Sequence, residues 1–91
     1  MKVVLNKCYG GFELSEFAAA RLGCDPMDGK KFRASEALVD LIEVYGSDAC
    51  SDSCADLRVV EVPDCASDQR VFDYDGIETL IYVVDGKLFT L

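Results

Sequence analysis

Residues 70–91 read RVFDYDGIETLIYVVDGKLFTL, and this stretch decides the fold. The pairs Asp75-Gly76 and Asp85-Gly86 divide it into three runs that are rich in β-branched and aromatic residues. Each Asp-Gly pair suits a two-residue type I′ turn, in which both turn residues have positive φ and the flanking strands pair antiparallel. The stretch therefore predicts a meander of three consecutive strands.

The rest of the chain predicts two further strands and two helices. Residues 2–9 and 57–62 are predicted to be strands. Helices are predicted at 16–22, between the N-cap Ser15 and Gly23, and at 36–45, between Ser35 and Gly46. In the helix at 16–22, Phe17, Ala18, Ala20 and Leu22 are expected to face inward. In the helix at 36–45, the stripe Leu38, Leu41, Ile42 and Tyr45 has the spacing i, i+3, i+4, i+7 that is typical of a buried helix face.

The predicted order of elements is β-α-α-β-β-β-β over residues 1–91, taken as one domain. Helices on one face of a sheet would bury the apolar stripes of both helices. We therefore expect an α+β fold in which two helices pack on one face of a mostly antiparallel sheet.

The chain is acidic, and the acid is concentrated in its second part. The formal net charge of the 91 residues is −8. Residues 1–39 hold six basic and five acidic residues, whereas residues 40–91 hold three basic and twelve acidic ones. Phosphate backbones repel such a surface, so direct nucleic-acid binding is disfavoured and a protein partner with a basic surface is favoured. The alternative is that the charge only keeps the domain in solution. The residues predicted for the acidic face are Asp40, Glu43, Asp48, Asp52, Asp56, Asp64 and Asp68.

The cysteines favour a reduced, cytoplasmic protein. Five are present, an odd number, and no secretory signal or membrane-spanning apolar run accompanies them. Cys50 and Cys54 have the C-x3-C spacing of some zinc ligands, and Cys65 or Cys24 could complete such a site. The preferred interpretation is that Cys50, Cys54 and Cys65 are loop residues with accessible thiols and that no metal is bound. Cys8 and Cys24 are expected to be small buried residues.

No histidine is present, so the commonest general base is missing and no Ser-His or Cys-His pair can form. We therefore expect no catalytic residues, no cofactor and no enzymatic activity. Gly10-Gly11 is too short a motif to indicate a phosphate loop. The alternative is a small-ligand or metal-binding module that uses Gly10-Gly11 or the Cys50, Cys54 and Cys65 group.

Two charged features remain. Lys30, Lys31 and Arg33 form the one basic cluster, which meets an anion or is a solvated loop face. A two-residue turn at Asp75-Gly76 would place Asp73 opposite Glu78, where like charges repel each other. A basic side chain such as Arg70, a cation, or a longer turn would have to relieve this repulsion.

Three segments resemble a family of small phage and prophage proteins: KVVLNKCYGGF at residues 2–12, LRVVEVP at 57–63 and DYDGIE at 73–78. The end of the chain departs from that family, since 79–91 is an apolar hairpin without the charged, histidine-bearing tail expected there. The resemblance implies a phage or prophage setting in a bacterial host, and it brings no catalytic residues with it.

Together these features predict an accessory protein that acts by binding a host or phage protein. One specific form is an anti-defence, anti-CRISPR-like inhibitor of a nucleic-acid-binding host protein, whose basic surface the acidic face would occupy. The last hairpin also predicts a homodimer, because two helices can hardly cover both faces of the sheet. The residues predicted for this self-association are Ile77, Ile81, Val83 and Leu88.

Overall fold

The computed structural model describes all residues from 1 to 91 and shows helices packed with two antiparallel sheets, which confirms the α+β class. The helices are α1 (Glu16–Leu22), the 3-10 helix η1 (Pro26–Phe32), α2 (Glu36–Tyr45) and α3 (Ser47–Cys50). The strands are β1 (Lys2–Asn6), β2 (Leu57–Glu61), β3 (Ser67–Tyr74), β4 (Ile77–Val84) and β5 (Lys87–Thr90). None of these helices has the length and apolar character that crossing a bilayer requires.

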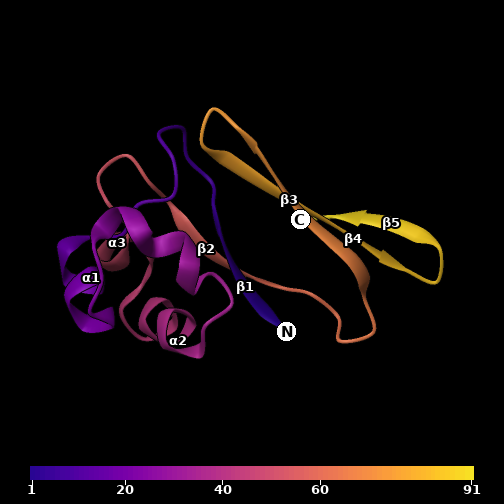
Figure 1. Cartoon of the computed structure of the whole chain (residues 1–91), viewed down its shortest axis with the longest axis horizontal. Coiled ribbons are helices and arrows are strands. Elements are labelled where there is room, and N and C mark those ends of the chain that lie inside the picture. The colour runs from indigo at the N-terminus through magenta and orange to yellow at the C-terminus, as the bar shows by residue number, and fades with distance from the viewer.

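The strands form two separate sheets in place of the single sheet expected from the sequence. β1 pairs with β2, and β3, β4 and β5 form a second, three-stranded meander. Figure 1 shows the helices gathered on one side of β1 and β2 and the meander on the other, with the β4–β5 turn pointing away from the helices. The protein is therefore layered as helices, two-stranded ribbon and meander, over a long axis of 40 Å.

The composition of the ribbon explains this layering. On one face, Val4 and Leu57 join the helical core, and on the other face Val3 and Leu5 pack with Leu80 of β4. A single sheet with helices on only one side would have left the second apolar face in water. The apolar residues on both faces of β1, which predicted an interior strand, are thus covered by two different layers.

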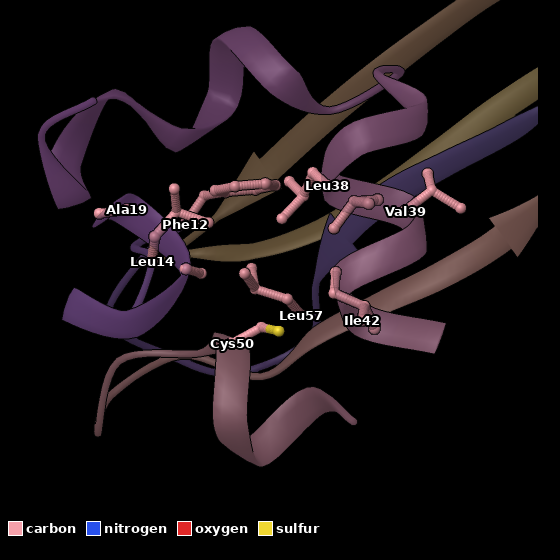
Figure 2. Packing of buried hydrophobic residues seen from close by; sticks show 10 residues of the cluster. Phe12, Leu14, Ala19, Leu38, Val39, Ile42, Cys50 and Leu57 are labelled. Atoms are coloured by element: carbon pink, nitrogen blue, oxygen red, sulfur yellow. The ribbon is translucent and has the colours of Figure 1, made fainter. Parts of the chain in front are cut away.

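The larger core lies between the helices and the ribbon. Figure 2 shows Leu38 and Ile42 of α2 pointing toward Leu14, Cys50 and Leu57, which arrive from the opening loop, α3 and β2. Leu14, Leu38, Cys50 and Leu57 are all fully buried. Burial of Leu38 and Ile42 confirms the inward stripe of α2, whereas its last member, Tyr45, is 49% exposed.

Both helix starts and both hairpin turns follow their sequence signals. The Ser15 side chain accepts a hydrogen bond from Ala18 N, and that of Ser35 accepts one from Ala37 N. Asp75 and Gly76 have φ of 52° and 94°, and Asp85 and Gly86 have 51° and 75°, as type I′ turns require. The predicted pairing of Asp73 with Glu78 is confirmed, and the turn at Asp85-Gly86 likewise pairs Tyr82 with Phe89.

Gly10 and Gly11 allow a close approach between two backbones. A Cβ atom on Gly76 would lie 2.3 Å from Gly11 N, and one on Gly10 would lie 2.6 Å from the Cys54 carbonyl oxygen. Gly10 N donates a hydrogen bond to the Asp75 carbonyl at 3.2 Å. The double glycine thus lets the β3–β4 turn pack against the opening loop. This turn lies beside Gly10-Gly11, where a small ligand was considered.

Candidate functional site

Glu78, one of the two opposed carboxylates of the meander, forms a buried ion pair with a distant arginine. The Arg33 guanidinium donates two hydrogen bonds to Glu78, at 2.9 Å to Oε1 and 2.6 Å to Oε2. The Glu78 side chain is 2% exposed and that of Arg33 is 18% exposed. Asp73 lies 4.0 Å from Lys30 Nζ. The like-charge repulsion is therefore relieved by basic side chains, as in one of the three alternatives, but by Arg33 and Lys30 rather than by Arg70.

This ion pair also completes the outer edge of β1. Val4 N donates to the Arg33 carbonyl at 2.8 Å, and the Val4 carbonyl accepts from Arg33 at 3.0 Å. Asn6 N donates to Glu78 Oε1 at 2.8 Å. Arg33 and Glu78 thus take the place of a third strand beside β1. No hollow reaches the pair, so we assign it a structural role.

The basic cluster at 30–33 is neutralised within the protein. Lys30 faces Asp73, Lys31 lies 3.8 Å from Asp28, and Arg33 is bound to Glu78. The anions that this basic cluster contacts are therefore carboxylates of the same chain.

The three cysteines considered for a metal are held apart. Cys50 ends α3 and is fully buried, which corrects the expectation that its thiol is accessible, and burial raises its pKa. Cys54 and Cys65 are exposed. Cys8 and Cys24 are only partly buried, which corrects the expectation that they are buried. No three Cys, Asp or Glu side chains come close enough together to hold a metal ion.

The seven residues predicted for an acidic face are spread over several elements. Asp56 accepts hydrogen bonds from Arg58 and Ser47, which together hold the pKa of its carboxyl low. Asp64 lies 3.0 Å from the amino group of Met1, and Asp68 lies 3.5 Å from Arg70. Asp48 is exposed on α3, and Asp52 lies beside Glu13, whose pKa it raises. Asp40 and Glu43, by contrast, share α2.

The outward side of α2 carries a row of carboxylates that we call the α2 ridge: Glu36, Asp40 and Glu43, at positions i, i+4 and i+7. Glu43 accepts hydrogen bonds from Lys2 at 2.8 and 3.1 Å, and it raises the pKa of that lysine. Glu36 and Asp40 have no cation within ion-pair distance.

Two hollows flank the ridge, and Asp40 lines both. The first, of about 340 Å³, lies between Lys2 and the three ridge carboxylates. The second, of about 410 Å³, lies between α1 and α2, and we call it the α1–α2 hollow. Its lining includes Leu22, Leu41 and Val44, together with Asp40 and with Arg21 of α1. An apolar floor beside an unpaired carboxylate suits a side chain that is apolar along its stem and cationic at its end.

An aromatic bracket borders the α1–α2 hollow. The rings of Phe17 and Tyr45 meet edge to face at 5.1 Å between centroids. The Arg21 guanidinium lies 4.8 Å from the Phe17 ring and 5.6 Å from the Tyr45 ring. Both rings were expected to face the core, but they remain partly exposed and instead link the two helices from outside, since Ala18 and Ala19 fill the inward face of α1. Ala20, also expected to face inward, is exposed.

Comparison with known proteins adds no further constraint on this site. The scan against protein-family models and the searches of curated proteins and of solved structures found no match to this chain.

The sequence analysis identified Asp40 and Glu43 by their charge, but it did not predict the hollows beside them. Glu36 begins the predicted helix at 36–45 and was not among the residues predicted for the acidic face. The exposed Val44, with 73% of its surface accessible, was a signal in the sequence, because it lies off the apolar stripe of α2.

Proposed function

We propose that this chain is a non-catalytic accessory protein that binds a protein partner by a segment combining basic and apolar side chains. The α2 ridge and the α1–α2 hollow form the binding surface. The observation that carries the proposal is the position of Asp40, an unpaired carboxylate that lines both hollows and adjoins exposed apolar side chains.

The energetics of α2 support this assignment. Like charges at i and i+4 on a helix are destabilising by about 0.2–0.5 kcal/mol per pair, so the repulsion between Glu36 and Asp40 offsets part of the stabilisation that Glu36 contributes in the first turn. Val44 and Tyr45 expose apolar surface next to them. A lysine or arginine flanked by aliphatic residues would relieve the repulsion and cover this surface in one contact.

The setting we propose is the one that the resemblance implies: the cytoplasm of a bacterium that carries the phage or prophage. The partner would be a host or phage protein with a basic surface. Surfaces that hold phosphate are rich in Lys and Arg, and an acidic ridge competes for the same side chains. An anti-defence, anti-CRISPR-like role against a nucleic-acid-binding host protein is the most specific form of this proposal.

The proposal is tested by calorimetric titration with a synthetic helical peptide that carries lysine on one face and leucine on the other. Asp40→Asn is expected to weaken binding by up to about fivefold, the range of one partly exposed ion pair. Val44→Lys places a cation in the hollow and is expected to weaken it further.

Asp85→Asn is the matched control for this titration. It removes the same charge from the exposed β4–β5 turn, where asparagine tolerates the positive φ. Equal weakening by Asp40→Asn and Asp85→Asn would mean that the peptide responds only to net charge, and the proposed site would then be wrong.

A further inference from the structure

The meander has one covered face and one open face. Along β4, Glu78 and Leu80 point to the ribbon and are buried, at 1% and 2% exposure. Their neighbours Ile77, Ile81 and Val83 point to the opposite side, where no other element of the chain packs. We call this side the outer face.

Cross-strand pairing adds aromatic and aliphatic side chains to the outer face. Tyr74 pairs with Ile77, Phe72 with Thr79, and Leu88 with Val83. Tyr74, Phe72 and Leu88 are 74%, 52% and 68% exposed. The face is therefore apolar from the β3–β4 turn to the β4–β5 turn, and it includes all four residues that the sequence predicted for self-association.

The outer face carries little net charge in a protein of net charge −8, because the one carboxylate that reaches it, that of Asp68, lies beside Arg70. Asp73 and Glu78 lie on the covered face, and Asp75 and Asp85 lie in the turns. The one charged side chain that the register places on the outer face is Arg70, which lies 3.5 Å from Asp68. The face is thus close to neutral, so two copies of this chain can meet here without the repulsion that their other, acidic surfaces would produce.

The size of the face fits a weak two-fold interface. Three strands about 4.8 Å apart and up to eight residues long at about 3.3 Å per residue span roughly 14 by 26 Å. Two such faces together present roughly 700 Å², well below the about 1,200 Å² of standard specific interfaces, so the contact is weak and transient. Face-to-face packing of two sheets is the usual arrangement in β-sandwiches.

We propose that the outer face binds a second copy of this chain, so that two meanders stack in a two-fold symmetric dimer. The contact is isologous, with the same side chains contributed by each copy. Because the area is small, we expect a weak dimer that forms only at high protein concentration. The α2 ridge belongs to the helical layer, across the ribbon from the outer face, and it stays free in the dimer.

Sedimentation equilibrium across the micromolar to millimolar range tests this proposal. The 10.0 kDa chain is expected to shift from monomer toward twice that mass as concentration rises. Leu88→Lys changes a side chain that is already 68% exposed and should leave the fold intact. It is expected to raise the dissociation constant by at least tenfold, and Ile81→Lys is expected to do the same.

Val44→Lys is the matched control, since it adds the same charge to the exposed side of α2 and should leave the dimer intact. The two surfaces are thus separable: Val44→Lys is expected to weaken peptide binding and keep the dimer, whereas Leu88→Lys is expected to weaken the dimer and keep peptide binding. A wild-type chain that stays monomeric at millimolar concentration would overturn the proposal. A dimer that withstands both Leu88→Lys and Ile81→Lys would also overturn it, by placing the contact elsewhere.

Discussion

Arg33→Ala is expected to lower the free energy of unfolding by about 3–5 kcal/mol, because it leaves the carboxylate of Glu78 buried without its counter-charge. Glu78 is 1% exposed and accepts two hydrogen bonds from Arg33, at 2.6 and 2.9 Å. The substitution also deprives the Val4 carbonyl of its donor at the edge of β1. Urea denaturation followed by circular dichroism measures the loss.

Arg70→Ala is the control for this experiment. Arg70 and Asp68 are 71% and 66% exposed, and their contact is 3.5 Å, so its removal should change stability by no more than about 0.5 kcal/mol. Arg33→Met combined with Glu78→Leu is expected to recover part of the loss, because no charge is left buried. The recovery is expected to be incomplete, because this double variant removes the acceptor of Asn6 N. If Arg33→Ala and Arg70→Ala had equal effects, the proposed role of the ion pair would be wrong.

Leu38→Ala is expected to destabilise the protein by about 2–5 kcal/mol, because it opens a cavity in a well-packed core. Leu38 is fully buried, and it lies at the centre of the cluster that joins α2 to the ribbon. The same denaturation experiment measures the effect as a lower midpoint with an unchanged slope.

Val44→Ala on the same helix separates packing from helix propensity. Val44 is 73% exposed, and alanine is the better helix former, so this variant should be about as stable as the parent or slightly more so. Comparable losses at positions 38 and 44 would show that α2 does not present its Leu38 side to the core.

The parts of the fold that the sequence predicts are those set by neighbouring residues. The Asp-Gly turns fix φ at two positions, and the turn length then fixes the pairing of Tyr82 with Phe89. Ser15 and Ser35 define helix starts through bonds to amides two or three residues away. These interactions are local, so their residue patterns are sufficient to identify them.

The parts that it does not predict depend on contacts between distant residues. Arg33 and Glu78 are 45 positions apart in the chain, and no local sequence pattern around either residue identifies the other as its partner. The division into two sheets depends on which layer covers Val3 and Leu5, and the same apolar pattern would suit an interior strand of one sheet. The helix η1 was not among the helices predicted from the sequence.

The candidate site shows the same division. Charge alone indicated Asp40 and Glu43, and the structure adds the hollows that give Asp40 apolar neighbours. It also shows why Asp56, Asp64 and Asp68 are poorer candidates, since each has a cationic group of this chain beside it. Sequence composition counts carboxylates but does not show which of them are already paired.

The most direct test of the proposed binding surface is to map the amide resonances that shift when the lysine–leucine peptide is added to isotope-labelled protein. The largest shifts are expected at residues 36–45 and at Arg21 and Leu22, which line the hollows beside Asp40. Asp40→Asn should reduce these shifts at equal peptide concentration, whereas Asp85→Asn should leave them unchanged. Shifts centred on the outer face of the meander, or spread evenly over all exposed carboxylates, would contradict the account.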